Sequence, residues 1–321
     1  MLTYPDYKEK NIIICNTNIK QRLSFVNDNL IIKDENDKTI IQTTCYTVFS
    51  LWIIGSITIT SGIMEKSKKF AFSIYLFNYS FKCYGVWASA TEGNFLLRHK
   101  QYHYNQIDIA QKIIENKINN QYNQIKSIRS KNIFQKRAIE SLKSYVPLLN
   151  DTTSIQSIMG IEGASSRMYF EAWFYEMDWK GRQPRAKRDI LNVLMDIGYT
   201  YLFNIVEAML NLYGFDLFKG VLHQNFYQRK SLVCDIVEPF RIIIDRQLKN
   251  AYNLSQIKED DFKLEYGRYI LKYEKSKEYT QWLVKSVLDY KEDIFKYVQQ
   301  YYRWFMKNKP IDEFPQFIFN P

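Results

Sequence analysis

Cysteine is scarce in this chain, and the four that occur are Cys15, Cys45, Cys83 and Cys234. No two of them form a Cys-x-x-Cys pair, so their spacing argues against a zinc ribbon and against a disulfide framework. The first thirty residues also lack the charged, apolar and small-residue series of a signal peptide. We therefore expect a reduced, cytoplasmic setting.

Two further absences narrow the function. None of the 11 glycines is followed by lysine, so a Walker-type phosphate loop is missing and ATP hydrolysis is not expected. Residues 39–64 carry no charge and are long enough to cross a bilayer. The many β-branched residues in this stretch, interrupted by Gln42 and Gly55, favour buried strands over a membrane span.

Positive charge is in excess, because 44 Lys and Arg residues face 34 Asp and Glu residues and give a net charge of +10. Such a balance indicates a polyanionic partner, first nucleic acid and second an anionic membrane surface, although solubility alone would also explain it. With 321 residues, 46% of them hydrophobic, the chain can bury a large core and divide into two domains.

The pattern of the chain changes near residue 88. Before it, short β-branched and aromatic runs alternate with turns, and residues 23–26 and 30–32 flank a polar triplet suited to a hairpin. After it, apolar residues recur at a spacing of three and four, which is typical of one-sided helices. The sequence therefore predicts an α+β protein, with an N-terminal β-rich domain over residues 1–88 and a larger all-α domain over residues 89–321.

Individual elements follow from the same patterns. Strands are predicted over residues 55–60, 70–77 and 80–87, and a short helix over residues 61–69. Longer helices are predicted over residues 92–128, 134–149, 155–175, 189–213, 230–252 and 279–306. The tail from Asn308, which contains three prolines, is expected to be extended or mobile.

Two carboxylates lie three positions apart in the predicted helix over residues 230–252. At 100° per residue, Asp235 and Glu238 lie about 4.5 Å apart along the axis and on neighbouring faces. Like charges this close destabilise a helix unless a positive group lies beside them. A divalent cation would meet that need, and so would Arg241. Pro239 should bend the axis here because it has no amide hydrogen.

An imidazole and a further carboxylate come from separate segments. His223 follows Gly220, and Glu162 stands between glycines that would let its backbone approach another chain closely. Taken singly, His223 is more typical of a core histidine and Glu162 of a carboxylate at a helix start. Combined with Asp235 and Glu238, amid basic residues, they indicate a metal-dependent site acting on nucleic acid.

Four blocks of sequence, in this order, carry a resemblance to a known family. They are Gly160-Ile-Glu-Gly-Ala-Ser-Ser-Arg-Met-Tyr-Phe170, Asp189-Ile-Leu-Asn-Val-Leu-Met-Asp-Ile-Gly-Tyr199, Gly220-Val-Leu-His223 and Ser231-Leu-Val-Cys-Asp-Ile-Val-Glu-Pro-Phe-Arg241. Together they closely resemble the CRISPR-associated spacer-acquisition integrase, the universal adaptation endonuclease of CRISPR systems. Residues 183–188 depart from the proline-rich lead-in that the family often has, which concerns loop contacts and not the metal site.

The resemblance implies that Glu162, His223 and Glu238 are metal ligands and that Asp235 assists them in catalysis, with Mn²⁺ or Mg²⁺ as the cofactor. It further implies an enzyme that joins 3′-OH ends of short DNA fragments to the CRISPR array by transesterification. It implies as well a homodimer formed largely through the β-rich domain over residues 1–88, catalysis in the helical domain over residues 89–321, and a small ferredoxin-like CRISPR adaptation partner protein. The residue types suit this chemistry independently, because carboxylates and an imidazole accommodate either metal ion and leave open positions for phosphate oxygens.

Basic residues near these blocks are candidates for contact with the DNA backbone. They are Arg182, Arg185, Lys187, Arg188, Arg229 and Lys230. A solvated charged loop is the alternative for them. Two other functions stay open: a stand-alone metal-dependent nuclease acting on branched or single-stranded DNA, and a non-enzymatic basic scaffold that only holds DNA.

Overall fold

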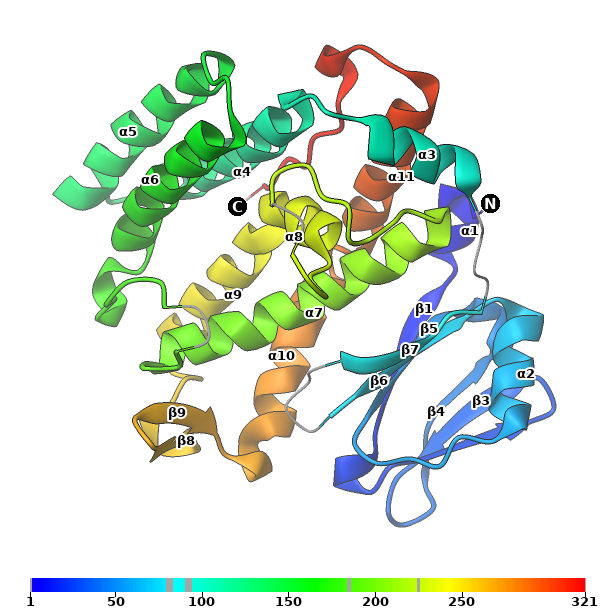
Figure 1. Cartoon of the computed structure of the whole chain (residues 1–321). Helices are drawn as coiled ribbons and strands as arrows, with labels where there is room; N and C mark the ends of the chain where they lie inside the picture. Colours follow the sequence, from blue (N-terminus) through cyan, green and yellow to red (C-terminus); the bar gives the residue numbers. More distant parts are fainter. Residues whose placement is uncertain (1, 79–82, 90–93, 184–185, 224–225, 321) are drawn as a thin grey trace. The chain divides into compact units, whose positions relative to one another are not determined.

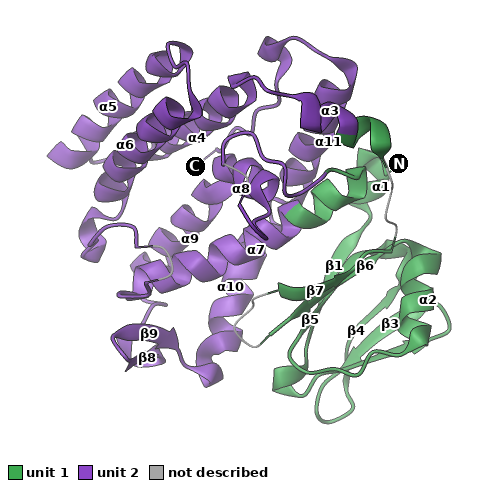
Figure 2. Ribbon diagram, viewed as in Figure 1, with its two compact units in different colours: residues 1–98, 207–215 green, residues 99–206, 216–321 purple. Residues whose placement is uncertain are grey.

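The computed structural model describes residues 2–78, 83–89, 94–183, 186–223 and 226–320. Two compact units are distinguished in Figure 2. Unit 1 comprises Met1–Arg98 and Glu207–Phe215, and unit 2 comprises His99–Val206 and Asp216–Pro321. A β-rich region precedes a larger helical region, so the predicted fold class is confirmed. The exact domain boundary after residue 88 stays a prediction.

Unit 1 is built on two sheets. The first has the order β1-β5-β6-β7, formed by β1 (Asn11–Asn16), β5 (Val48–Ile54), β6 (Ser73–Phe77) and β7 (Cys83–Trp87). Strands β1, β5 and β6 are parallel, and β7 is antiparallel to β6. Every residue of β5 is buried, as expected for a central parallel strand. The middle of the uncharged stretch at residues 39–64 therefore lies in the core of unit 1.

The second sheet of unit 1 is antiparallel and contains the predicted hairpin. Its strands are β2 (Arg22–Val26), β3 (Asn29–Lys33) and β4 (Thr39–Thr44). Leu23 pairs with Ile32, and the tight turn passes through Asn27 with a φ of 54°. Asparagine tolerates this left-handed conformation better than most residues, which explains why the polar triplet predicted the turn correctly.

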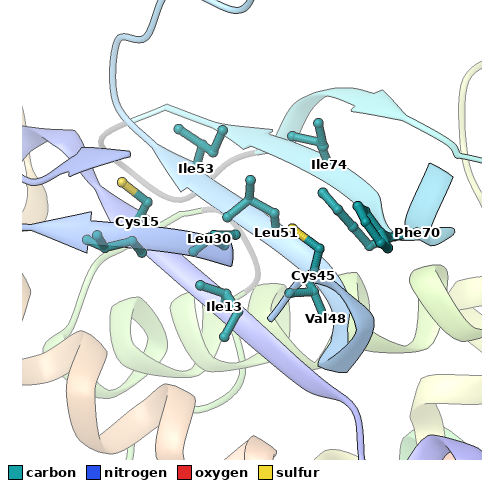
Figure 3. Packing of buried hydrophobic residues seen from close by; sticks show 11 residues of the cluster. Ile13, Cys15, Leu30, Cys45, Val48, Leu51, Ile53, Phe70 and Ile74 are labelled. Carbon is teal, nitrogen blue, oxygen red and sulfur yellow. The ribbon is translucent and has the colours of Figure 1, made fainter. Parts of the chain in front are cut away.

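The core of unit 1 draws side chains from both sheets and from α2 (Ser61–Phe70), as Figure 3 shows. Ile13, Leu30, Leu51 and Phe70 are among its buried members. Cys15 belongs to it too, and burial raises the pKa of its thiol to about 11, so this cysteine stays protonated and serves packing.

The predicted strand over residues 55–60 is wrong, although the predicted helix that follows it is present as α2. Gly55 stands just after β5 with a φ of 100°, a conformation that L side chains rarely adopt. A Cβ there would lie 2.5 Å from both Asn18 Oδ1 and Thr17 Oγ1. The glycine therefore ends the strand, whereas the alternation of apolar residues after it only mimics one.

The remaining helices follow in chain order. Unit 1 also has α1 (Tyr4–Lys8), η1 (Thr17–Ile19) and η2 (Cys45–Thr47). Later elements are α3 (Phe95–His103), α4 (Asp108–Lys126), α5 (Ile133–Asn150), α6 (Ile155–Trp173), η3 (Tyr175–Met177), α7 (Ile190–Tyr213), α8 (Ser231–Val237), η4 (Glu238–Phe240), α9 (Arg241–Asn253), α10 (Ser276–Leu288) and α11 (Lys291–Lys307). Within unit 2, α4, α5 and α6 pack against one another (Figure 1).

Helix α4 is unusual because the buried part of its surface is partly polar. Its apolar positions Ile113, Ile114 and Ile118 are buried as the spacing predicted, but Lys117 and Asn120 are buried too. Buried polar groups need partners. These two residues find theirs in the candidate site and in the C-terminal tail.

The C-terminal tail is extended, and it is anchored to α4. After η7 (Ile311–Glu313), Asn116 exchanges two hydrogen bonds with the backbone of Phe317, at 2.8 and 2.9 Å. Asn120 donates to the Phe317 carbonyl at 2.9 Å and accepts from the Phe319 amide at 3.0 Å. Phe314, Phe317 and Phe319 are buried, so of the two expected states, extended or mobile, the structure has the extended one.

Among the described helices, only α7 is long and apolar enough to cross a membrane, and 78% of its most apolar window is buried inside the protein.

A hairpin of β8 (Phe262–Glu265) and β9 (Arg268–Leu271) interrupts the helical region. Its turn uses Tyr266 and Gly267, both with positive φ, which the helical patterns did not predict.

Candidate active site

Two carboxylates from different helices meet at one ammonium group in unit 2. Lys117 Nζ, on α4, donates to Glu162 Oε1 of α6 at 2.5 Å and to Glu238 Oε2 of η4 at 2.7 Å. Only 7% of Lys117 and 4% of Glu238 is exposed. The two glutamates were predicted site residues from distant parts of the sequence, and the structure brings them together. Lys117 was not predicted.

A local change of helix type positions Glu238. The Glu238 amide donates to the Asp235 carbonyl, three residues earlier, so α8 tightens into the 3-10 turn η4. Pro239 has no amide hydrogen and continues this turn into α9, which gives the predicted break beside the acids. Asn120 donates to the Pro239 carbonyl at 3.2 Å, so α4 holds the residue after Glu238 as well.

Positive groups keep Glu238 ionised in its buried position. Arg241 places a guanidinium nitrogen 2.9 Å from Glu238 Oε1, opposite the oxygen that contacts Lys117. Burial alone would raise the pKa of the Glu238 carboxyl, but Arg241, Lys117 and His223 outweigh it and lower that pKa to about 2. Arg241, which the sequence offered as an alternative to a divalent metal ion, thus neutralises negative charge on Glu238.

The Lys117 ammonium stays protonated because two carboxylates contact it. Burial alone would lower the pKa of the Lys117 ammonium, but Glu162 and Glu238 raise it above its ordinary value. Glu162 also accepts a hydrogen bond from Ser166 Oγ at 2.8 Å. The pair of glutamates is therefore charged and holds one positive group between them.

His223 is oriented by Asp235. Asp235 Oδ1 accepts from His223 Nδ1 at 2.6 Å and from the His223 amide at 2.9 Å. Its Oδ2 accepts from the amides of Val221 and Leu222 at 2.6 and 3.1 Å. Because Nδ1 carries the proton of this bond, Nε2 of a neutral His223 keeps its lone pair for a ligand. Asp235 is fully buried and saturated with donors, so it fixes the loop and the ring.

Gly220 makes this arrangement possible. A Cβ at residue 220 would lie 2.6 Å from Asp235 Oδ2 and 2.8 Å from Ser231 Cβ. Both distances are far below ordinary contact, so any larger residue would push the loop away from the carboxylate. The glycine three positions before His223 was therefore a sequence signal for a closely packed loop.

The glycines around Glu162 have a different setting. An added Cβ at Gly160 or Gly163 would meet no described atom within 4 Å, and both residues are exposed on α6. No other described part of this chain approaches them, so the close approach to another chain stays a prediction. They leave the surface of α6 beside Glu162 without side chains.

The donor set suits a divalent cation. Among the described residues, no group of three or more His, Cys, Asp or Glu side chains is already arranged around a metal position. However, Glu162 and Glu238 already converge on one cation, and His223 lies close enough to lower the pKa of Glu238. Two carboxylates and an available imidazole nitrogen are ligands that Mg²⁺ and Mn²⁺ accept.

A small cavity lies behind Glu238. It is lined by Lys117, Gln121, Phe170, Glu238, Pro239, Arg241, Ile242 and Asp245. Gln121 is 3% exposed, and its Oε1 is a buried oxygen that accepts no hydrogen bond from a described residue. Asp245 accepts from Tyr199 Oη at 2.5 Å, and burial raises the pKa of its carboxyl to about 7.

The predicted DNA-binding residues differ in their exposure and in their bonds within the protein. Arg182 is held by Asn192 Oδ1 at 2.7 Å and Asp196 Oδ1 at 2.6 Å, so its guanidinium serves the internal structure. Arg188 and Arg229 are exposed, and Lys187 and Lys230 are partly exposed. Arg185 lies outside the described residues. DNA contact by any of these residues stays a prediction.

Comparison with known proteins identifies the family. The family model described as CRISPR associated protein Cas1 matches residues 15–284. This span is most of the chain, so the chain belongs to the Cas1 family and the resemblance found in the sequence is confirmed.

Individual relatives agree with this assignment. The chain is 29% identical over 223 residues to CRISPR-associated endonuclease Cas1 1 of Thermodesulfovibrio yellowstonii, covering 65% of this chain and 70% of that protein. It is 32% identical over 169 residues to CRISPR-associated endonuclease Cas1 of Leptospira interrogans, covering 49% of this chain and 66% of that protein.

Solved structures share the fold. A CAS1 protein from Thermotoga maritima superposes with a TM-score of 0.73 at 18% identity, covering 97% of this chain and 99% of that one. A casposase bound to its integration product gives a TM-score of 0.72 at 18% identity, covering 93% and 91%. The Cas1-containing chain of a Cas6-RT-Cas1–Cas2 complex gives 0.78 at 21% identity, covering 96% of this chain and 36% of that one.

Proposed function

We propose that this protein is a divalent-metal-dependent DNA endonuclease and integrase of CRISPR adaptation. In this proposal it joins the 3′-OH ends of short DNA fragments to a CRISPR array. The observation that carries the proposal is the convergence of Glu162 and Glu238, from separate helices, on a single cation. The names of the relatives, which are CRISPR-associated endonucleases, support it.

Each site residue then has a chemical role. Glu162, Glu238 and His223 would hold Mn²⁺ or Mg²⁺, which when bound polarises a phosphodiester and stabilises the charge of the transition state. Glu238 is suited to this because its low pKa keeps it ionised. Asp235 holds Nδ1 of His223 so that Nε2 faces away from it.

The reaction needs no ATP. A DNA 3′-hydroxyl attacks a phosphodiester, a new phosphodiester forms, and the leaving strand departs with its own 3′-hydroxyl. The number of phosphodiester bonds is unchanged, so little free energy is required. This agrees with the absence of a Walker-type phosphate loop from the sequence.

Basic residues would hold the DNA backbone. Arg188 and Arg229 are exposed, and Lys187 and Lys230, next to them in the sequence, are partly exposed. Phosphate contacts of this kind fix the register of DNA without reading its sequence. The casposase with a similar fold is bound to an integration product, which supports a DNA-bound state for this protein too.

Partners follow from the family. We propose a homodimer formed through unit 1 and assembly with a small ferredoxin-like partner of the Cas2 type. Solved complexes with similar Cas1 folds are named as Cas1–Cas2 complexes, which supports the second partner. Strand β7 supports the first, because it is an edge strand with exposed Tyr84 and Trp87.

A strand-joining assay tests the function. The wild-type protein, with Mn²⁺ and the small partner, should join a 3′-OH DNA fragment to a supercoiled plasmid bearing a CRISPR repeat. Glu162→Ala, His223→Ala and Glu238→Ala should each lower joining by at least ~100-fold while DNA affinity is retained, because each removes a ligand of the ion that stabilises the transition state. Glu176→Ala is the control, since among the described residues this exposed carboxylate forms an ion pair with Lys249 alone, outside the site.

The same assay separates the alternatives. Cleavage of branched or single-stranded DNA without joining, with or without the small partner, would favour a stand-alone nuclease. DNA binding with neither cutting nor joining would favour a non-enzymatic scaffold. If all three site variants join DNA as well as the wild type, the site assignment is wrong.

A further inference from the structure

Lys117 occupies the position between Glu162 and Glu238 where the proposed function needs a metal ion. We propose that Lys117 is an internal competitor of the divalent cation: its ammonium balances the site in the metal-free protein and must leave the two carboxylates when the ion binds. This inference rests on the proposed function and adds a regulatory residue that the sequence blocks do not contain.

The contact distances place the ammonium between the two carboxylates. Lys117 Nζ lies 2.5 Å from Glu162 Oε1 and 2.7 Å from Glu238 Oε2, so it fills the space between those two oxygens. A divalent ion held between the same two carboxylates would compete with the ammonium for this space.

The charges lead to the same result. Four directly paired groups, Glu162 and Glu238 with Lys117 and Arg241, carry two negative and two positive charges, so together they are neutral in the metal-free protein. A divalent ion added to these four groups would leave a net charge of +2 on them in largely buried surroundings. Repulsion between charges a few ångströms apart is strong in such surroundings. The lysine therefore weakens metal binding as long as it stays on the carboxylates.

The cavity behind Glu238 offers Lys117 an alternative position. Lys117 lines it together with Gln121, one helical turn further along α4. The buried Gln121 Oε1 has no hydrogen-bond partner among the described residues, which is costly in a folded protein. An ammonium displaced from the carboxylates can donate to this oxygen, so Oε1 of Gln121 would accept the displaced lysine.

Another buried lysine shows what a purely structural pair looks like. Lys249 donates to the Trp173 carbonyl at 3.0 Å and to Glu176 Oε2 at 2.9 Å. Its single carboxylate partner is largely exposed, and its second partner is a backbone oxygen. Lys117, by contrast, bridges two carboxylates from two helices and depends on no backbone carbonyl for this contact.

Mn²⁺ binding to the full-length protein without DNA tests the inference, with the free ion measured by electron paramagnetic resonance. Lys117→Met keeps the length of the side chain and removes its charge, and it should tighten Mn²⁺ binding at least tenfold, about 1.4 kcal/mol. Gln121→Leu should weaken Mn²⁺ binding in the wild-type background and have no effect when combined with Lys117→Met. Lys249→Met should leave the affinity unchanged.

Thermal unfolding provides a second measurement of the competition between Lys117 and the metal ion. In EDTA, Lys117→Met should melt below the wild type because two carboxylates lose their shared cation, and Mn²⁺ should raise its melting temperature more than that of the wild type. If Lys117→Met binds Mn²⁺ no more tightly than the wild type, the competition does not exist. If that happens while Glu238→Ala still abolishes Mn²⁺ binding, only the inference fails. If neither wild type nor Lys117→Met binds Mn²⁺, the metal-dependent function fails with it.

Discussion

Asp245 illustrates how burial controls a single residue beneath the candidate site. Its carboxyl is 1% exposed, accepts from Tyr199 Oη, and has a pKa raised to about 7 by burial. The unfolded chain would ionise this group near its ordinary value of 3.8. Between these two values the folded protein holds a proton that the unfolded chain has lost. Stability contributed by this group therefore falls as the pH rises through that window.

Asp245→Asn should remove this part of the pH dependence. The amide keeps an oxygen for Tyr199 but cannot ionise, so the variant should gain stability over the wild type by about 1.4 kcal/mol per pH unit between about pH 4 and pH 7. Urea unfolding at several pH values measures the difference. Asp151→Asn, at an exposed position after α5, should follow the wild type. Parallel curves for Asp245→Asn and wild type would contradict the raised pKa.

For single residues, the sequence indicated which acids could belong to a site, but it did not indicate which side chains contact them. Glu162 and Glu238 could be selected because they lie in sequence blocks that resemble a known family, beside glycine and proline, which are unfavourable in a helix interior. Lys117 could not be selected, because one lysine among 44 basic residues carries no signal of its own. The pattern Lys117, Asn120 and Gln121 on the core side of an apolar helix was the available hint, since polar residues at core positions need a reason.

At the scale of elements, α4 links the candidate site to the tail. Asn120 donates to the carbonyls of Pro239 and Phe317 and accepts from the amide of Phe319. The residue following a proposed metal ligand and the end of the described chain therefore depend on one amide side chain. Because every one of these groups is buried, the loss of the side chain leaves backbone groups without partners.

Asn120→Ala should destabilise the protein by at least about 2 kcal/mol, because each buried polar group left unpaired costs ~1–3 kcal/mol. Amide hydrogen exchange at Phe317 and Phe319 should accelerate in the variant. Asn123→Ala is the matched control, since it makes the same exchange at a half-buried position of the same helix. Equal stability of the two variants would show that the tail does not depend on Asn120.

Helices were easier to predict than their ends. The long periodic runs gave α5, α6 and α7 close to their observed bounds, because one-sided apolar spacing persists over many turns. The run over residues 92–128 is divided into α3 and α4, and the run over residues 279–306 belongs to α10 and α11. The β8–β9 hairpin escaped because its short strands are separated by only Tyr266 and Gly267. Short elements depend on tertiary pairing that local sequence does not encode.

At the scale of the whole molecule, unit 1 carries the proposed dimer surface. Strand β7 ends the order β1-β5-β6-β7 in its sheet, and its residues Tyr84, Val86 and Trp87 are exposed. An edge strand with exposed aromatic residues is a site for association with another chain. The fold class followed from the sequence because the β-rich and helical patterns occupy separate parts of the chain, whereas an assembly surface has no local pattern.

Light scattering in solution should therefore find a dimer. Tyr84→Glu places a charge on this edge and should shift the protein toward the monomer, with a dimer dissociation constant raised at least ~100-fold. Tyr227→Glu, an equally radical change at an exposed residue of unit 2, should leave the dimer intact. A dimer that survives Tyr84→Glu unchanged would place the interface elsewhere.

The hydrogen bonds between α4 and the tail join residues that the ribosome synthesises at very different times. Phe317 follows Asn116 by 201 positions, so the ribosome makes this partner long after α4 itself. Until then the side chains of Asn116 and Asn120 have no tail to bind, and Phe240, in the same turn as Pro239 and Glu238, lacks its ring contact with Phe317. We expect the site of a nascent chain to be less firmly held until the tail has been synthesised, even when all the site carboxylates are already present. The proposed cutting of DNA would then await translation past Phe319.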